Sequence, residues 1–268
     1  MNIVVFIRQI LDPQVNLEGI DYFDESKINV DDLIINTIDK NAIEGALKFK
    51  DSDGATVTAV CVGDMKPEKA VREAIAMGCN SGIVVNSKEI FSHDPFTMAK
   101  VYQKILEKIG EYDLVMIGGQ VMPTSSYAEA PMLAELLDIP SVLYVEKLEK
   151  KDNAFIVSRV LEGGKEIVQV PLGQSLFSIS DSEYFIPRYT SMRGIMMSKR
   201  AQIPTWTLED LGLSVSDIGK DSSDLEVVSL ENIVIEKESF IISEGEPEEM
   251  IDKLLEKMKE DGIKLGGA

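Results

Sequence analysis

Histidine and cysteine are nearly absent from this sequence. Its 268 residues include one histidine, His93, and two widely separated cysteines, Cys61 and Cys79. Most zinc sites and nucleophile–histidine catalytic sets need more such residues, so we expect no metal site and no catalytic side chain. Both cysteines are expected to be buried as small apolar residues. His93 is expected in a solvated loop.

Positive charge is also scarce. The chain has 27 Lys and Arg residues against 46 Asp and Glu residues, which gives a formal net charge of −19. Nucleic acids and anionic membrane surfaces need basic patches, so neither is an expected partner. The acidity is compatible with a cationic patch on a partner protein, although it more often serves solubility. Paired-carboxylate catalysis stays open, but no acid stands out by its sequence context.

Long apolar runs are missing. No stretch approaches the ~20 apolar residues that cross a bilayer. The run at 3–7 follows no basic segment and is too short for a signal peptide. The sequence therefore predicts a cytoplasmic protein without membrane insertion.

The common phosphate-binding motifs are absent as well. There is no Walker A sequence, and no Gly-x-Gly-x-x-Gly follows the first apolar run, where Ile7, Arg8, Gln9 and Ile10 stand instead. An ordinary dinucleotide-binding half of the Rossmann kind is thereby excluded.

The first 145 residues alternate short apolar runs with helical patterns. Runs rich in β-branched residues predict strands at 3–7, 56–62, 82–85, 114–117 and 142–145. Helices are predicted at 36–50, from 67 to a stop at Gly78, from 94, and at 130–138. This order predicts an α/β fold with a parallel sheet covered on both faces, as in Rossmann-like and adenine nucleotide α-hydrolase-like nucleotide-binding domains.

The pattern changes after about residue 146. A β-hairpin is predicted with strands at 155–160 and 167–170 around a Gly163-Gly164 turn, and a further strand at 176–180. We expect three parts: a nucleotide-binding domain with this hairpin (1–182), a locally basic, extended, protruding arm (183–205), and a C-terminal extension (206–268). The last part contains a weak strand at 233–235 and an amphipathic helix from Pro247.

Ligands of parallel sheets bind beyond the carboxyl ends of the strands, which selects residues 8–9, 62–64, 86–97 and 118–126. In the last segment two glycines allow backbone to approach a ligand, and Thr124, Ser125 and Ser126 precede a helix whose N–H groups suit a phosphate. Ordinary N-capping by one hydroxyl explains these residues equally well. The Val62-Gly63 turn can face an adenine or ribose, or be a simple turn.

Four polar residues lie either directly after the first predicted strand or at the start of the first predicted helix. Asn36 is explained by N-capping. Asp39 and Asn41 fall too deep in the helix for capping, so they are candidates for ligand or loop contacts. Arg8 lies where a phosphate or a flavin could be met, and the alternative is an ordinary surface arginine.

Five motifs in order resemble the β subunit of the electron-transfer flavoproteins. They are NTIDKNAIEGAL at 36–47, REAIAMG at 72–78, DLVMIGGQ at 113–120, EGG at 162–164 and PRYTSMRGIMMSK at 187–199. The resemblance covers nearly the whole chain.

The resemblance implies a heterodimer with an α subunit, on which the C-terminal helix packs, and electron transfer through flavin. The β-subunit cleft in this family holds either a structural AMP or a whole FAD. The FAD form occurs in electron-bifurcating members, which accept hydride from NADH. These pass one electron to ferredoxin or flavodoxin and the other to an acyl-CoA or other flavin dehydrogenase. For the arm, the resemblance implies a loop that docks on the dehydrogenase, with Met192 as its apolar anchor. The alternative is that Met192 is a core residue.

The resemblance also implies a set of cofactor-binding residues. They are Ile7, Arg8, Asn36, Asp39, Asn41, Val62, Gly63, Asp94, Thr97, Gly119, Gln120, Val121, Pro123, Thr124, Ser125, Ser126 and Ala128. One departure is clear: where the family usually has an Asp-Gly-Asp-Thr type sequence, this chain has Met-Pro-Thr-Ser-Ser at 122–126. Fewer carboxylates repel a pyrophosphate less, which favours FAD over AMP.

Three other functions are weighed against a bifurcating subunit. One is a non-bifurcating carrier with AMP. Another is a nucleotide-binding sensor of the universal-stress type, against which the β-rich second half and the arm speak. The third is a nucleotidyl-transferring enzyme, which would need a histidine motif near the first strand.

Overall fold

The computed structural model describes residues 1–14, 29–120, 126–226, 228 and 239–263. The chain divides into two units, Met1–Leu225 and Glu226–Ala268. Each unit is described by itself.

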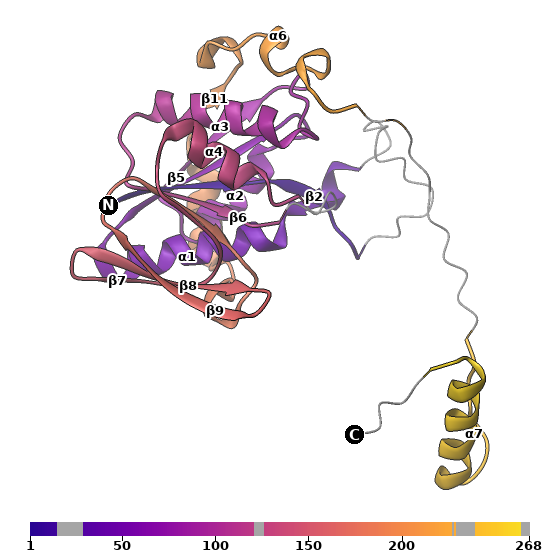
Figure 1. The fold of residues 1–268 in the computed structure, drawn as a ribbon. Helices are drawn as coiled ribbons and strands as arrows, with labels where there is room; N and C mark the ends of the chain where they lie inside the picture. Colours follow the sequence, from indigo (N-terminus) through magenta and orange to yellow (C-terminus); the bar gives the residue numbers. More distant parts are fainter. Residues whose placement is uncertain (15–28, 121–125, 227, 229–238, 264–268) are drawn as a thin grey trace. The chain divides into compact units, whose positions relative to one another are not determined.

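The first unit is built on a nine-stranded, mostly parallel sheet, which confirms the α/β class (Figure 1). The strand order is β11-β5-β4-β1-β6-β10-β7-β8-β9. The bounds are β1 Asn2–Ile7, β4 Thr56–Gly63, β5 Ser81–Asn86, β6 Leu114–Gly118, β7 Ser141–Lys151, β8 Ala154–Leu161, β9 Gly164–Pro171, β10 Ser175–Ile179 and β11 Thr205–Trp206. A small antiparallel sheet pairs β2 Gln9–Leu11 with β3 Leu33–Ile35.

The first four helices follow the predicted alternation: α1 Thr37–Asp53, α2 Glu68–Met77, α3 Pro95–Ile109 and α4 Glu129–Leu137. Helices α5 Met192–Arg200 and α6 Val215–Ile218 were not predicted, and the unit also has 3-10 turns η2 Val30–Asp32, η3 Glu183–Phe185, η4 Glu209–Leu211 and η5 Lys220–Ser222. Gly54 ends α1 in the left-handed conformation. Gly78 ends α2 at φ 136°, outside the left-handed helical region that the sequence suggested.

Two hydrophobic cores lie on opposite faces of the sheet. Side chains alternate along β1, so Ile3, Val5 and Ile7 join the core under α1 and α2. Val4 and Phe6 join the core under α3 and α4. Figure 1 shows α1 and α3 on opposite sides of the sheet. Both cysteines are buried as predicted, and burial raises the pKa of the Cys79 thiol to about 12.

The predicted hairpin is confirmed, and it belongs to the same sheet as the strands before residue 146. β7 is one strand that crosses this position, and β8 and β9 extend the same sheet by antiparallel pairing. The chain then returns and inserts β10 between β6 and β7, parallel to both. The sequence predicted this strand without its central place.

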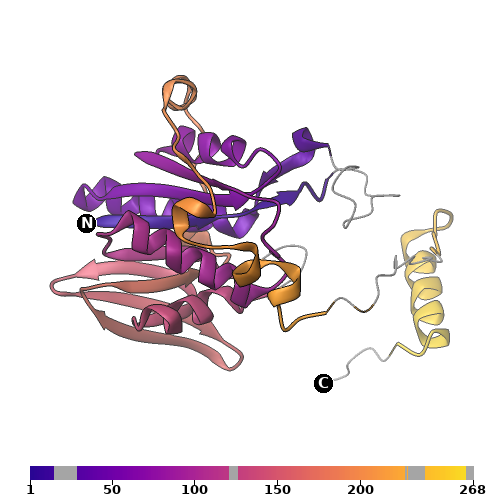
Figure 2. The same ribbon diagram turned by 90° about the horizontal axis from the view of Figure 1, so that it is seen from above.

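The expectation of an extended arm is wrong in its local structure. Residues 192–200 form α5, and the Ser191 hydroxyl caps it by accepting the Gly194 N–H at 2.9 Å. α5 packs on α2 so closely that a Cβ at Gly194 would lie 2.2 Å from the Ala76 carbonyl oxygen. The segment stands out from the rest of the unit and returns to the sheet edge, where β11 pairs with β5 (Figure 2).

Two further segments complete the chain. Within the first unit, η4 and α6 contact α3. The second unit contains the predicted C-terminal helix, α7 Pro247–Glu260. The predicted strand at 233–235 lies outside the described residues. None of the helices in the described parts of the chain is long and apolar enough to cross a membrane. The functional division at 183 and 206 stays a prediction.

Candidate functional site

Four parallel strands end at one edge of the sheet. The register pairs Ile7 at the end of β1 with Cys61, and Gly63 at the end of β4 with Asn86. From β1 the chain continues to β4 and β5, which lie on one side of β1 in the sheet. It then crosses to β6, which lies on the other side of β1. Such a point, where strand order reverses, is where α/β sheets bind ligands. Residues that follow β1, β4 and β6 therefore meet at a candidate site.

Arg8 is buried at this edge, so its reading as a surface arginine is wrong. It is 7% exposed. Its Nε donates to Asp39 Oδ2 at 2.9 Å, its backbone N–H donates to the same oxygen at 2.8 Å, and its Nη2 donates to Asp39 Oδ1. Burial alone would lower the pKa of Arg8, but the charges of Asp39 and Glu129 outweigh burial and raise it. Arg8 is therefore a fixed buried cation.

Asp39 and Arg8 together hold the peptide groups of Gly118, the last residue of β6. The Gly118 N–H donates to Asp39 Oδ1 at 3.0 Å, and the Gly118 carbonyl accepts from Arg8 Nη2 at 2.6 Å. A Cβ at Gly118 would lie 2.2 Å from Asp39 Oδ1. Glycine is thus required here by the neighbouring carboxylate.

Gly119 has a similar reason to be glycine. Its N–H donates to the Ile179 carbonyl at 2.7 Å, and an added Cβ would lie 3.0 Å from the Ser178 hydroxyl. Both glycines thus make room for protein atoms, and the expectation that they also let backbone approach a ligand stays a prediction. The role of Gly119 in cofactor binding stays a prediction.

Glu129, the first residue of α4, belongs to the cluster and was not predicted. It is buried, and its Oε2 accepts from Arg8 Nη1 at 3.1 Å. Burial raises its pKa, Asp39 adds to this effect, and Arg8 opposes it. Acids are common in the first turn of exposed helices, so the sequence carried no signal that this one is buried.

Asn36 precedes α1 but does not cap it, which corrects the sequence interpretation. Its Nδ2 donates to the Gln120 carbonyl at 2.8 Å, and no side-chain cap forms. Its Oδ1 is buried, as is Nε2 of Gln9, and neither atom has a hydrogen-bond partner in the structure as described. Buried polar atoms are normally satisfied. These two atoms, near one end of β1, are buried and unsatisfied, so polar groups of a ligand could satisfy them only after the side chains around them moved.

Three other predicted residues already have partners in the protein. Asn41 donates through Nδ2 to Asp181 Oδ1 at 3.1 Å, which is the loop contact offered as one alternative. Asp94 caps α3 by accepting from the Phe96 N–H at 2.9 Å, as its position before the helix predicted.

Asp94 also accepts from the hydroxyl groups of Thr97 at 3.0 Å and Ser223 at 2.8 Å. Burial would raise the pKa of Asp94, but these hydrogen bonds outweigh burial and lower it. Among the described residues, Asp94, Thr97 and Ser223 therefore form a group separate from the Arg8 cluster.

The remaining predicted residues divide into described and undescribed ones. Ile7 is a buried core residue, and Val62 packs against the second core. A Cβ at Gly63 would lie 3.8 Å from Gln9 Oε1, so this turn is close to the unsatisfied amide. Ser126 Oγ accepts from the Ala128 N–H at 3.3 Å, in the turn before α4, and the N-cap position itself is Ala128, without a side-chain cap. Val121, Pro123, Thr124 and Ser125 lie outside the described residues.

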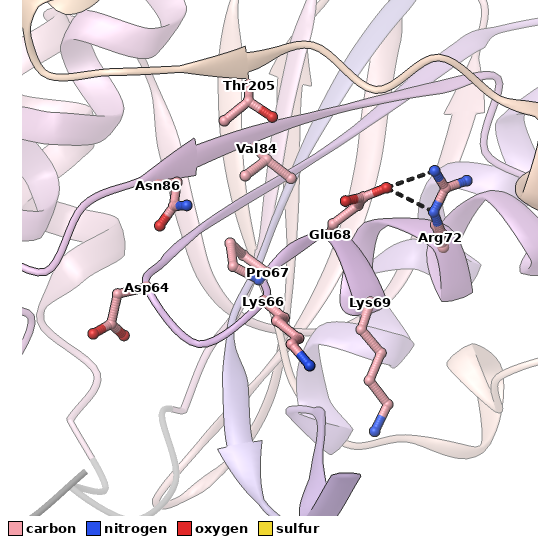
Figure 3. Close-up of a pocket in the computed structure, with 9 residues that line it drawn as sticks. All are labelled: Asp64, Lys66, Pro67, Glu68, Lys69, Arg72, Val84, Asn86 and Thr205. Carbon is pink, nitrogen blue, oxygen red and sulfur yellow. Dashed lines mark hydrogen bonds and ion pairs between the residues drawn. The ribbon is translucent and has the colours of Figure 1, made fainter. Parts of the chain in front are cut away.

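A cleft of about 500 Å³ opens at the ends of β4 and β5 beside the start of α2 (Figure 3). Its lining residues are Asp64, Lys66, Pro67, Glu68, Lys69, Arg72, Val84, Asn86 and Thr205. Figure 3 shows Arg72 paired with Glu68 on the α2 side. Arg72 also donates to the Ser198 carbonyl of α5. Helix α2 thus connects this cleft to the segment at 183–205.

The root of that segment is held by a second arginine. Arg188 donates to both oxygens of Glu44 at 2.8 and 3.0 Å, and to Asp51 at 2.8 Å. The hydrogen bond with Glu44 is the main cause that raises the pKa of Arg188. Beyond this root Met192 is 78% exposed, so the alternative of a core methionine is wrong. Tyr189, Met196 and Met197 are exposed as well.

The fold and the polar cluster at its carboxyl edge define a Rossmann-like α/β protein. The family model described as "Electron transfer flavoprotein domain" matches residues 28–211. The chain belongs to this family and is a β subunit within it. It is 33% identical over 260 residues to the electron transfer flavoprotein subunit beta of Thermoanaerobacterium thermosaccharolyticum, which covers 96% of this chain and 98% of the relative.

Two further relatives are subunits of reductase complexes. The chain is 29% identical over 231 residues to the caffeyl-CoA reductase–Etf complex subunit CarD of Acetobacterium woodii, with 86% of this chain and 87% of the relative covered. It is 34% identical over 165 residues to the acryloyl-CoA reductase electron transfer subunit gamma of Anaerotignum propionicum, with 61% of each covered. As a β subunit the chain transfers electrons in a heterodimer with an α subunit, which sets aside the stress-sensor and nucleotidyl-transferase alternatives.

Proposed function

We propose that this β subunit binds FAD at the carboxyl edge of its sheet and takes part in electron bifurcation. NADH delivers its hydride at this edge in the proposal. One electron goes to ferredoxin or flavodoxin, and the other goes through the α subunit to an acyl-CoA or other flavin dehydrogenase. The alternative is a non-bifurcating carrier that holds AMP. We also propose a cytoplasmic location.

The observation that carries a nucleotide site is the pair of unsatisfied polar atoms beside β1. Asn36 Oδ1 can accept from a hydroxyl or amino group, and Gln9 Nε2 can donate to a ring nitrogen or carbonyl oxygen. Both belong to segments fixed by the Arg8–Asp39 pair, so their backbone is held in place before a ligand arrives. The residues present therefore fit an adenine nucleotide or a flavin. FAD, when bound, supplies the redox chemistry, and the protein supplies position and electrostatics.

Two observations support FAD and bifurcation over AMP. The segment 122–126 has no acids, so it repels a pyrophosphate less than the usual sequence of the family. Two relatives are named as subunits of acryloyl-CoA and caffeyl-CoA reductase complexes. Such names are consistent with a chain that delivers electrons to a reductase.

The segment at 183–205 supports docking of the dehydrogenase. Arg188 fixes its root on α1, and the contact of Gly194 with Ala76 fixes α5 on α2. Met192 projects from this rigid base with most of its surface exposed. A methionine adapts its shape to an apolar pocket, so Met192 suits the anchor of a docking contact.

Nucleotide content tests the proposal. The chain is produced with its α subunit, the heterodimer is denatured, and released FAD and AMP are counted. Two FAD per heterodimer support the proposal, and one FAD with one AMP supports the non-bifurcating alternative. A heterodimer with no nucleotide beyond the flavin of the α subunit would overturn binding at this edge.

A pair of variants assigns the nucleotide to the predicted edge. Asn36→Ala removes an unsatisfied acceptor, so the second nucleotide should be lost or weakened. Asn153→Ala, in the exposed turn between β7 and β8, is the matched control and should keep full content. Equal content in both variants would place the nucleotide elsewhere.

A further inference from the structure

The cluster at the carboxyl edge has unequal charges. One buried cation, Arg8, faces two buried carboxylates, Asp39 and Glu129. Burying a charge is costly unless a partner compensates it. One carboxylate is therefore in excess, at the edge of the sheet where an anionic nucleotide is proposed to bind.

The hydrogen bonds identify Glu129 as the carboxylate in excess. Asp39 accepts four hydrogen bonds from N–H groups, three from Arg8 and one from Gly118, so both its oxygens are occupied. From the described residues Glu129 accepts one, from Arg8 Nη1. A proton added to Asp39 would displace a donor, whereas Glu129 Oε1 can take a proton without breaking a bond.

The titratable groups around Glu129 come from three elements among the described residues. Arg8 follows β1, Asp39 belongs to α1 and Tyr102 belongs to α3. Cys61 of β4 interacts in turn with Asp39 and Tyr102. Burial raises the pKa of both Tyr102 and Cys61, so these two groups stay neutral. Burial likewise favours the neutral form of Glu129 and raises its pKa. Glu129 is the carboxylate of this set whose protonated form burial favours, and its Oε1 can accept a proton.

We infer that Glu129 is a proton-uptake site at the carboxyl edge of the sheet: it takes a proton from solvent when the phosphates of a nucleotide arrive at the first turn of α4. The first turn of a helix offers free N–H groups to a phosphate. Glu129 occupies that same turn, and like charges at this separation disfavour each other. The proton joins Glu129 Oε1, and the net charge of the cluster rises from −1 to zero. This inference rests on the proposed function, because it needs a nucleotide at the carboxyl edge.

Calorimetry on the heterodimer tests the inference. After its nucleotide is removed, the protein is titrated at pH 7 with FAD, and separately with AMP, in buffers with different heats of ionisation. The dependence of the binding heat on the buffer gives the number of protons taken up. The wild-type protein should take up about half a proton or more beyond the Glu129→Gln variant. Protons carried by the phosphate itself are common to both proteins and cancel in this difference.

A pH profile separates this role from a structural one. The wild-type affinity should fall as pH rises and Glu129 ionises, whereas Glu129→Gln should bind about tenfold tighter than wild type at pH 8 and show a flat profile. A residue that merely supported the fold would weaken binding at every pH when replaced. Glu135→Gln, an exposed position on the same helix, is the matched control and should behave as wild type.

The possible outcomes are distinct. Equal proton uptake by wild type and Glu129→Gln, with both binding nucleotide, overturns the inference and leaves the proposed function intact. Weaker binding by Glu129→Gln at every pH also overturns it. If wild type binds neither FAD nor AMP, the proposed function is wrong, and the inference is wrong with it.

Discussion

Two arginines in this chain each hold two carboxylates, and they do so in different surroundings. Arg8 is buried with Asp39 and Glu129 at the carboxyl edge, where its side chain is 8% exposed. Arg188 holds Glu44 and Asp51 at the root of the docking segment, where its side chain is 34% exposed. The chemistry of the pairs is the same, so burial decides what each one does. Arg8 is needed for the fold and the site, whereas Arg188 orients the segment at 183–205.

The largest expected effect comes from Arg8→Met. The change leaves Asp39 buried without its cation, which typically costs about 3–5 kcal/mol. Arg188→Met should cost less, about 1–3 kcal/mol, because Arg188 is partly exposed and solvent screens Asp51, so that Glu44 alone is left buried without its partner. Urea unfolding of both variants measures the difference. If the two variants lose similar stability, burial is not what separates the two arginines.

The next effect concerns the glycine that Arg8 and Asp39 hold. Gly118→Ala would bring a Cβ to 2.2 Å from Asp39 Oδ1, so the cluster must shift. Overpacking of this kind costs about 1–3 kcal/mol. Gly163→Ala, in the β8–β9 turn where a Cβ meets no atom within 4 Å, serves as the control. Thermal unfolding should shift for Gly118→Ala and stay nearly constant for the control.

A smaller effect should depend on pH. Burial raises the pKa of Glu129, so the folded protein binds this proton more tightly than the unfolded chain. The stability from this group is present below its ordinary pKa and is lost as pH rises through the raised value in the folded protein. The Glu129→Gln variant has no group to ionise at this position. Its free energy of unfolding should therefore rise relative to that of wild type as the pH increases from 5 to 8.

Urea midpoints measured across this range check the sign of the effect. Glu135→Gln, on the exposed side of α4, should follow wild type at every pH. A wild-type advantage over Glu129→Gln that grows with pH would mean that the Arg8 pair stabilises the ionised carboxylate more than burial penalises it.

These cases also show what the sequence could predict. The strands and helices of the first 145 residues follow from apolar periodicity and from stops such as Gly54, because local signals decide local structure. The sequence also predicted that residues after β1, β4 and β6 would meet, because parallel strands end at one edge. The central place of β10 was not predicted, since strand order depends on packing between distant segments.

Within the site, the sequence named the residues better than it named their roles. Asn36 carried the local pattern of a helix cap, yet its amide bonds Gln120, 84 residues away. Glu129 was missed because an acid in a first turn is ordinary until Arg8 and the sheet bury it. Such roles are set by tertiary contacts, which periodicity does not report. The same holds for α5, whose nine residues pack on α2 and lack a long apolar stripe.

The smallest effect on stability, and the sharpest on function, is expected from Met192→Ala. Met192 is exposed and rigidly based, so unfolding should change by less than about 0.5 kcal/mol. Electron delivery to the dehydrogenase should slow severalfold, with FAD content unchanged, because the proposed anchor is lost. Met132→Ala, at an exposed methionine of α4, is the control for lost apolar surface and should transfer electrons normally. Arg188→Met should slow delivery in the same assay, since it frees the root and keeps the anchor. If Met192→Ala transfers electrons at the wild-type rate, the segment at 183–205 does not dock through this residue, and Arg188 then holds a segment with another purpose.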